Sequence, residues 1–437
     1  MRAVPWAAAC AFSLVLYWPG VTAWFQRDDF DWLGLRGTTL REALFTPKAQ
    51  GTVRVLGERA YFLGLSSLFG PNPLAFRLCA FLTMFASLAF LIAIVRRLTR
   101  SALVAALSAL FWLSNSTLAP LMTWSSAYNQ ILCGFFLLAS LWLLERYLAT
   151  GKSRYCAGQW LTFLAGFGAN EIMTVYPALA AAYCLCRKRQ VPKSVMALFL
   201  GSLLFVIVEF TYVHPGSRTG LYALHVDGSM FRTFLKHWQS AAGPGRLYVL
   251  GLVGRRTGMW LSIAIAAGLA LSVWRAARAR DWWPVFWLGW FVIVLAPVLP
   301  LRDHVVDYYA ALASIGLAVL AASAFGDASR LVRAVGVVWV GIYVVCSVVA
   351  AREMTKGSHE DSIVAKAFVQ ELRRIDTAPI VVQSLTPAQA AAVDHAWRQF
   401  GLSDVRILPP AECSRIHREL GVAVYAFDGR QLTEVDQ

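Results

Sequence analysis

The chain has 437 residues, of which 58% are hydrophobic and 15% are charged, and its mean hydropathy is +0.55. Soluble domains carry about 25% charged residues, so the composition excludes an ordinary soluble domain and predicts an α-helical polytopic membrane protein. A formal net charge of +15 would suit a nucleic-acid-binding protein, but the basic residues follow the predicted membrane topology. We therefore expect no nucleic-acid partner.

Hydropathy predicts about eleven membrane spans. Their approximate ranges are 4–24, 74–95, 102–120, 124–145, 157–170, 172–186, 194–213, 257–274, 283–301, 307–325 and 332–350. With the N-terminus in the cytoplasm, each inner loop carries Arg or Lys, whereas the short outer turns near Leu121 and Asn170 carry neither. This is the positive-inside pattern. The first segment ends in Trp18, Pro19 and Trp24, without a small-residue cleavage site, so we interpret it as a retained span.

This topology places three larger segments outside the membrane, over 25–73, 214–256 and 352–437. In the first of these loops, Leu40–Phe45 and Tyr61–Phe69 are amphipathic stretches that predict interfacial helices. The segment 352–437 has a soluble composition and predicts a small α/β domain that follows the transmembrane domain 1–351. Its expected helices cover 365–375 and 387–400, and its expected strands cover 379–383, 405–408 and 422–427.

The eight cysteines indicate no special chemistry. Most lie inside apolar stretches, and neither a CxxC pair nor a Cys/His metal spacing is present in the sequence. A disulfide framework and a zinc site are therefore not expected. The sequence holds no decisive ligand set for a divalent cation, so the cofactor stays open.

An acidic cluster, Asp28-Asp29-Phe30-Asp31, directly follows the first span. One carboxylate there would be explained as the cap of a short helix. Three carboxylates beside a bilayer favour a functional role, because ionisable groups near the membrane are costly and are usually functional.

Further polar groups share the predicted outer depth. Glu171 lies in the turn between the fifth and sixth spans, and the junction between the ninth and tenth spans carries Arg302, Asp303 and His304, followed by Asp307-Tyr308-Tyr309. Singly, Glu171 could cap a helix, and Arg302 with Asp303 could be a local ion pair worth less than about 1 kcal/mol. Together these residues predict one site between helices on the extracytoplasmic face.

A lipid-linked phosphosugar fits such a site, because its polyprenyl tail lies in the bilayer and its phosphate lies at the interface. An Asp can take the proton of an acceptor hydroxyl as that oxygen attacks the anomeric carbon. Arg or Lys can neutralise the departing phosphate, and Arg255 and Arg256 of the second outer loop are candidates. His304 would be a phosphate donor, an acid-base group or a structural hydrogen-bonding residue.

Several motifs resemble the GT-C superfamily of integral-membrane glycosyltransferases, of the protein O-mannosyltransferase and aminoarabinose-transferase type. The resemblance covers residues 1 to about 350. It rests on the aromatic-flanked pair in Phe25-Gln-Arg-Asp28-Asp29-Phe30, on Glu58-Arg59-Ala-Tyr61 leading to Leu68-Phe69-Gly70-Pro-Asn-Pro73, on Thr123-Trp124-Ser-Ser-Ala-Tyr128, on Asn170-Glu171 with Tyr176-Pro177, and on Arg302-Asp-His-Val-Val-Asp-Tyr308-Tyr309. The Arg-Pro of the family is here Arg59-Ala60.

The resemblance implies a polyprenyl-phosphate-sugar donor, an inverting transfer and an Asp of the first outer loop as general base. We assign the base to Asp29 and orientation of the acceptor to Asp28, with the reverse order nearly as well supported. Because an interfacial carboxylate adds little to stability, Asp29→Asn is expected to lower transfer while the protein still folds. Substrate binding is assigned to Glu171, Arg59, Arg255, Arg256, Arg302, Asp303 and His304.

Two other classes stay open. A polytopic chain with buried charges would also suit a transporter or lipid flippase, although transporters usually place ionisable groups near the bilayer midplane. A membrane scaffold or polymerase partner with an inactive site is the third possibility. The sugar, the acceptor and the lipid carrier cannot be predicted from the sequence.

Overall fold

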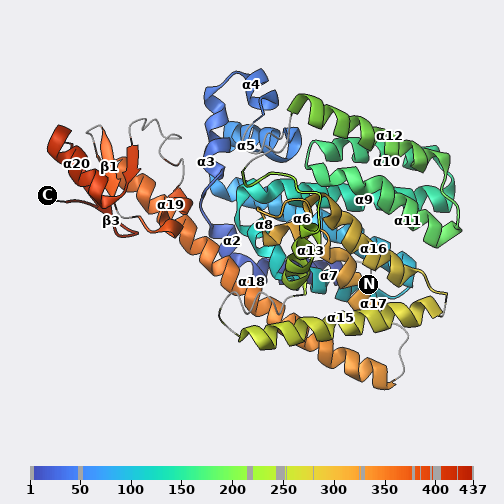
Figure 1. Cartoon of the computed structure of the whole chain (residues 1–437). Helices are drawn as coiled ribbons and strands as arrows, with labels where there is room; N and C mark the ends of the chain where they lie inside the picture. Colours follow the sequence, from blue (N-terminus) through green and yellow to red (C-terminus); the bar gives the residue numbers. More distant parts are fainter. Residues whose placement is uncertain are drawn as a thin grey trace.

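The computed structural model describes residues 4–47, 53–213, 220–242, 251, 253–278, 280–323, 325, 330–375, 379–383, 385–393, 396, 405–420 and 422–435. A bundle of helices forms the body of the molecule, and a small sheet lies at the end of a long helix that leaves the bundle (Figure 1). The described residues therefore confirm a helical protein with a small C-terminal α/β domain.

Three helical segments are long and apolar enough to cross a membrane, namely Pro73–Thr99, Ser125–Thr150 and Lys193–Thr211. Ala102–Ser114 and Ser116–Thr123 make a fourth if this pair, bent by 60°, counts as one span. Shorter apolar helices cover Val4–Leu16, Trp283–Val298 and Ser314–Ser323. The protein is thus a helical membrane protein. The predicted spans 257–274 and 332–350 lie inside the long helices Arg255–Arg278 and Arg330–Leu372, whereas 172–186 begins as a 3-10 turn before the helix Tyr176–Lys188.

The helices of the described residues follow one another with short breaks. In chain order they are α1 (Val4–Leu16), α2 (Trp18–Thr22), α3 (Asp29–Leu33), α4 (Leu40–Phe45), α5 (Tyr61–Phe69), α6 (Pro73–Thr99), α7 (Ala102–Ser114), α8 (Ala119–Thr123), α9 (Tyr128–Thr150), α10 (Ser153–Phe167), α11 (Tyr176–Lys188), α12 (Lys193–Val208), α13 (Ser229–Ala241), α15 (Arg255–Arg278), α16 (Trp283–Leu295), α17 (Ser314–Ser323) and α18 (Arg330–Leu372).

The two helices predicted in the first outer loop are confirmed as α4 and α5. Helix α4 begins with a capping box, in which the Thr39 hydroxyl accepts a hydrogen bond from the Glu42 backbone N–H and the Glu42 carboxylate accepts one from the Thr39 N–H. Helix α5 ends at Gly70, whose φ of 66° lies in the region that only glycine adopts at little cost.

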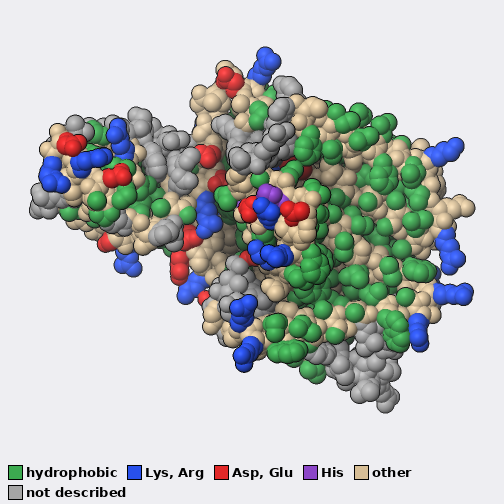
Figure 2. All heavy atoms as spheres, in the orientation of Figure 1, with side chains coloured by type: hydrophobic (Ala, Val, Ile, Leu, Met, Phe, Trp, Pro, Cys, Tyr) green, Lys and Arg blue, Asp and Glu red, His purple; other side chains and the backbone are tan. Residues whose placement is uncertain are grey.

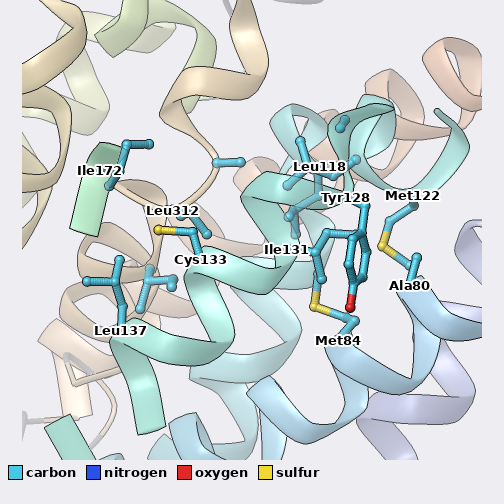
Figure 3. Close-up of a cluster of buried hydrophobic side chains, with 14 of the residues drawn as sticks. Ala80, Met84, Leu118, Met122, Tyr128, Ile131, Cys133, Leu137, Ile172 and Leu312 are labelled. Atoms are coloured by element: carbon cyan, nitrogen blue, oxygen red, sulfur yellow. The ribbon is translucent and has the colours of Figure 1, made fainter. Parts of the chain in front are cut away.

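The core lies between α6, α7, α9 and α17, whose apolar faces are buried against one another. Figure 3 shows one part of it, where Ala80 and Met84 of α6 face Tyr128 and Ile131 of α9. The Tyr128 ring also stacks on Tyr61 of α5, with ring centroids 3.9 Å apart. This stacking ties the first outer loop to the bundle.

The basic ends of two helices meet a buried carboxylate near the end of a third. Glu145 near the end of α9 is 1% exposed, and its oxygens lie 2.8 Å from Arg97 Nε at the end of α6 and 3.6 Å from Arg187 Nη2 at the end of α11. Figure 2 shows apolar side chains over the bundle, with Lys and Arg at its right edge. The basic ends of these helices therefore gather on one side.

The long helix α18 has 43 residues and is about 65 Å long at 1.5 Å per residue. The boundary expected between 351 and 352 falls inside it. The domain beyond carries β1 (Ile380–Gln383), α19 (Pro387–Val393), β2 (Val405–Leu408), α20 (Pro410–Leu420), β3 (Val424–Phe427) and β4 (Leu432–Glu434). The sheet order is β2-β1-β3-β4, and β1 runs parallel to β2 and β3. We call residues 379–435 the appendage.

The strand predicted over 405–408 is confirmed as β2, and β1 and β3 lie within their predicted ranges. The helix predicted over 387–400 begins after Thr386, whose hydroxyl accepts a hydrogen bond from the Gln389 backbone N–H as the expected cap. Residues 394–395 and 397–400 lie outside the described residues. The sequence did not predict α20 or β4.

Candidate active site

A cavity of about 590 Å³ lies among the first outer loop, the start of α9, the end of α12 and the loops before α13 and α17. One wall is polar and carries Asp28, Arg54, Glu58, Ser126, Asn129, Gln130, Asn170 and Glu171. The apolar residues of the lining, which we call the apolar wall, include Phe205, Val206, Phe210, Leu224, Val226, Pro297, Val298, Pro300 and Leu301. The cavity can therefore hold a molecule with one polar and one apolar part.

The two neighbouring acids of the first outer loop have different surroundings. Asp28 precedes α3, is exposed and lines the cavity. Asp29 is 0% exposed, and its Oδ1 accepts hydrogen bonds from the Ser126 N–H at 2.7 Å and hydroxyl at 2.6 Å. Its Oδ2 accepts a third from the Gln26 N–H at 3.1 Å. The exposed carboxylate of Asp28 is thus open to the cavity, whereas the oxygens of Asp29 are buried and hydrogen-bonded, and which of the two acts as base stays a prediction.

The same contacts correct the premise that Asp29 is a solvated interfacial carboxylate. Burial raises the pKa of the Asp29 carboxyl, whereas the nearby Arg77 charge and the donors of Ser126 and Gln26 lower it. The Arg77 side chain is itself 1% exposed and donates to the backbone oxygens of Ala23 and Trp24. Asp29 is thus part of a buried polar cluster that fixes the start of α3.

Arg54 holds two carboxylates of the polar wall. Its Nη1 lies 2.7 Å from Glu58 Oε1, and its Nε lies 2.9 Å from Glu171 Oε1. Asn129 Nδ2 also donates to Glu58 Oε1, at 2.8 Å. Burial alone would lower the pKa of Arg54, but Glu171 and Glu58 more than offset this and raise it well above its usual value. The guanidinium is therefore charged and fixed in direction.

Close backbone packing brings Glu58 and Glu171 together. Glu58 lies in a π-helical turn, Val55–Ala60, of a kind often found at functional sites. Leu56 and Gly57 both donate their backbone N–H groups to the Gly168 oxygen, at 2.7 Å and 3.0 Å. A Cβ on Gly57 would lie 2.6 Å from the Ala169 oxygen, so no larger residue fits here without displacing the backbone.

Aromatic rings border the polar wall. Tyr308 belongs to the 3-10 turn Asp307–Ala310, and its ring meets Trp124 edge to face with centroids 5.9 Å apart. The Tyr309 ring lies 5.0 Å from that of Tyr308. Trp32, Trp124, Tyr222, Tyr308 and Tyr309 all line the cavity. Such rings offer flat apolar faces and polar edges, which suits a sugar ring.

Arg302, Asp303 and His304 lie outside the lining that brings Asp28 and Glu171 together. Asp303 Oδ2 is 3.0 Å from His225 Nε2, and Arg302 Nη1 is 3.4 Å from Asp227 Oδ2. These pairs are half-exposed and link two loops at the surface. Burial lowers the pKa of His304, and its ring lies 4.3 Å from that of Tyr222, which lines the cavity.

The other expected cations are also absent from the described lining. Arg59 is 0% exposed, its Nη2 donates to the Thr46 oxygen, and its guanidinium carbon lies 4.5 Å from the centre of the Trp32 ring. The guanidinium of Arg59 therefore packs on the ring of Trp32, which itself lines the cavity. Arg255 and Arg256 are exposed at the start of α15. Direct contact of these three with a ligand in the cavity is not supported.

Sequence reasoning did not assign Arg54, Glu58 or Glu209 to the site, although all three line the cavity. The spacing of Arg54 and Glu58 is the one signal available, because residues four apart meet on a helical turn. Glu209 begins a second π-helical turn, Glu209–Val213, after α12. The described lining therefore holds four carboxylates and one guanidinium. Within the described residues, no group of three or more His, Cys, Asp or Glu has a metal-binding arrangement.

No family model matches the sequence, and no curated protein matches it. Solved structures that are similar to the chain include two of the same protein. The crystal structure of ArnT from Cupriavidus metallidurans bound to undecaprenyl phosphate is 14% identical, with 96% of this chain and 92% of that chain covered and a TM-score of 0.49. The structure of the same protein in the apo state is 12% identical, with 98% and 93% covered and a TM-score of 0.47.

Proposed function

We propose that the protein is a membrane glycosyltransferase that moves a sugar from a polyprenyl-phosphate donor to an acceptor hydroxyl, with Asp28 as general base. The observation that carries this proposal is that Asp28 lines a cavity whose lining combines polar side chains with many apolar ones. The sequence motifs of the first outer loop, which resemble those of the GT-C superfamily, support the same assignment.

Asp28 suits the role of base better than its neighbour. It is exposed to the cavity, so an acceptor hydroxyl can approach within hydrogen-bond distance and transfer its proton to the carboxylate as the new glycosidic bond forms. Asn129, Gln130 and Asn170 line the same wall. Their amides can donate and accept hydrogen bonds, as the hydroxyls of a sugar require.

Arg54 is the cation of the described lining and is assigned to the departing phosphate. Glu58 and Glu171 hold its guanidinium in place, so little side-chain ordering remains to be done when the donor binds. As the bond between the anomeric carbon and the phosphate oxygen breaks, the lipid phosphate gains negative charge beside this guanidinium. Glu171 thus acts through Arg54.

The apolar wall provides a path for the lipid. Phe205, Val206 and Phe210 line the cavity, and they belong to the span Lys193–Thr211, of which 17% of the most apolar window is buried inside the protein. Leu203, Leu204 and Ile207 of the same span are exposed. A polyprenyl chain in the bilayer can therefore reach the cavity along this helix.

We assign the cavity to the extracytoplasmic face and retain about eleven crossings, with short and broken helices completing the count. The cavity lies at the start of α9 and before α11, whereas Arg146 and Arg187 lie near the other ends of these helices. Because basic residues mark the cytoplasmic side, this arrangement supports an outer site. Labelling from each side of a sealed vesicle at Asp31→Cys tests it, and reaction only from the cytoplasmic side would reverse the orientation.

The test of the function is transfer of a labelled sugar from a polyprenyl-phosphate donor by the purified protein in lipid nanodiscs. Asp28→Asn is expected to lower the rate by roughly 10²–10⁴-fold, the usual contribution of a general base. The matched control is Asp31→Asn, since Asp31 is exposed in the same acidic cluster but does not line the cavity. Full transfer by Asp28→Asn would refute the assignment.

A transporter remains the competing class, because the pair α7 and α8 is bent by 60° and broken helices are common in transporters. The break is occupied by protein, however. Asn115 Oδ1 accepts a hydrogen bond from the Thr117 N–H, and its Nδ2 donates to the Ala241 oxygen and to the Tyr343 hydroxyl. Movement of intact lipid-linked sugar across vesicles, without bond cleavage, would favour transport.

A further inference from the structure

Residues 24–28, the segment that carries Asp28, lie against residues 351–372 of α18, which we call its outer half. The two segments are more than 300 residues apart in the sequence. The Trp24 N–H donates to Ser362 Oγ at 3.0 Å, and Gln26 Nε2 donates to Ser358 Oγ at 2.9 Å. Arg27 Nη2 lies 3.1 Å from Asp361 Oδ2. Figure 1 shows α18 passing α2 on its way from the bundle to the sheet. Residues 24–27 are thus attached to this helix at three points.

The appendage contributes a fourth contact. The Arg27 N–H donates to the backbone oxygen of Ala392 in α19, at 3.1 Å. Arg27 has a φ of 55°, in the left-handed region, which costs a residue with a side chain roughly 1–2 kcal/mol. A conformation of this kind persists when surrounding contacts determine it. The contacts to Asp361 and Ala392 therefore hold the backbone turn immediately before Asp28.

The buried side of α18 around Ser362 includes several small residues. Ala351, Thr355, Ser362 and Ala365 are each 0% exposed, and their spacing of three, four and seven places them on one side of the helix. Ser362 Oγ also donates to the His359 oxygen at 2.7 Å, which fixes its lone pairs toward Trp24. Small hydroxyl side chains let the loop approach closely and satisfy its polar groups.

We infer that Ser358, Ser362 and Asp361 are positioning residues of the active site, through which the outer half of α18 and the appendage set the place of Asp28. This inference rests on the proposed function for its catalytic consequence. The serines act through Gln26 and Trp24 and the aspartate acts through Arg27, so none of them needs to touch the substrate.

The reaction requires that the carboxylate of Asp28 be held in a precise position. Asp28 is followed by the buried, hydrogen-bonded Asp29, so its position is fixed on that side by Ser126. On the other side it depends on Arg27, and the contacts with Ser358, Ser362 and Asp361 fix the residues 24–27. Displacing a reacting group by about 1 Å can lower a rate by roughly 100-fold, so loss of these contacts is expected to reach the chemistry.

The first measurement is steady-state transfer by the full-length double variant Ser358→Ala, Ser362→Ala in nanodiscs. We expect kcat to fall about 10- to 100-fold, with the KM for the lipid-linked donor nearly unchanged because the lining stays intact. The single variant Ser358→Thr, in a chain that keeps Ser362, retains the hydroxyl and is expected to have a kcat close to that of the native protein. The control is Lys356→Ala, Glu360→Ala, which removes an exposed pair from the same helix and is expected to leave kcat unchanged.

A second measurement separates this inference from the proposed function. The labelling rate of Asp28→Cys by a charged thiol reagent is compared with and without the two serine substitutions, in a detergent-solubilised full chain. A changed rate is expected whether or not the protein transfers sugar. An unchanged rate together with unchanged kcat would overturn the positioning role. A changed rate in a protein that transfers no sugar would retain the positioning role and remove the glycosyltransferase.

If the double variant Ser358→Ala, Ser362→Ala does not fold, its kcat cannot be measured. The single variant Ser358→Ala then replaces it, because Ser358 is partly exposed and its loss removes one hydrogen bond of about 1 kcal/mol. A Ser358→Ala protein with normal melting temperature and normal labelling at Asp28→Cys would equally overturn the inference.

Discussion

Asp29→Asn is expected to weaken the fold rather than act on the chemistry directly. Asp29 Oδ1 accepts two hydrogen bonds from Ser126, and an amide oxygen at that place can still accept both. The amide nitrogen of Asn must then face the Gln26 N–H, so a donor meets a donor where Oδ2 now accepts. Arg77, which is fully buried, loses the negative charge next to it.

The size of this effect follows from those two losses. A hydrogen bond to a charged group is worth about 1.5–3 kcal/mol, and a buried polar group left without its partner costs about 1–3 kcal/mol. Domains have roughly 5–15 kcal/mol of stability, so the variant is expected to lose a large fraction of its folded population on mild heating.

The assay is thermal unfolding in detergent, followed by tryptophan fluorescence and by the fraction that remains monodisperse. Asp31→Asn is the control, because Asp31 is exposed in the same cluster, and it should lower the midpoint by much less than Asp29→Asn. An Asp29→Asn midpoint within about 1 °C of the native one would refute the reasoning. It would mean that the Asp29 carboxyl, whose pKa burial raises, is already protonated in the fold.

Three further outcomes are expected. Glu145→Gln leaves Arg97 and Arg187 without their buried carboxylate, and should lower the unfolding midpoint by an amount equivalent to roughly 1–3 kcal/mol while transfer per folded molecule stays normal. Gly57→Ala forces a Cβ against the Ala169 oxygen, and should cost about 1–3 kcal/mol and reduce transfer, whereas Gly64→Ala, where the Cβ meets nothing within 4 Å, should do neither. Burial lowers the pKa of His237 from 6.5 to about 4. The charge of Asp307 raises this pKa in part, and the charge of Lys236 lowers it further. His237 is therefore protonated at a lower pH in the folded state than in the unfolded state. The free energy of unfolding has its full value above pH 6.5 and falls by about 3 kcal/mol as the pH is lowered toward 4. His237→Phe should flatten a plot of melting temperature against pH, and an unchanged slope would contradict this.

The sequence predicted those helices and strands that are determined by a few neighbouring residues. The capping box at Thr39 and the apolar period of Tyr61–Phe69 are readable in a few residues, and α4 and α5 begin and end where these patterns do. The strand Val405–Leu408 was predicted for the same reason. Helix α20 was missed because its sequence, although amphipathic, is mostly polar and lacks the long apolar run that marks a span.

The site was predicted in part. The sequence singled out Asp28 and Glu171, and both line the cavity. It could not separate Asp28 from Asp29, because the burial of Asp29 depends on hydrogen bonds from Ser126, a residue 97 positions away in the sequence. Arg54 was missed since its two partners come together only when Gly57 packs on the turn at Gly168. Arg59 was assigned to the substrate from its motif, yet burial against Trp32 gives it a supporting place.

The attachment of the first outer loop to α18 has a consequence for biosynthesis. The hydrogen bond between Trp24 and Ser362 joins residues 338 positions apart, so it cannot form until almost the whole chain has left the ribosome. The early spans can insert and pack before then, but the turn before Asp28 must wait for its last partner. A nascent or prematurely terminated chain would therefore occupy the membrane with an incompletely ordered acidic loop. Pulse-labelled chains should acquire protease resistance at this loop only after the appendage has folded.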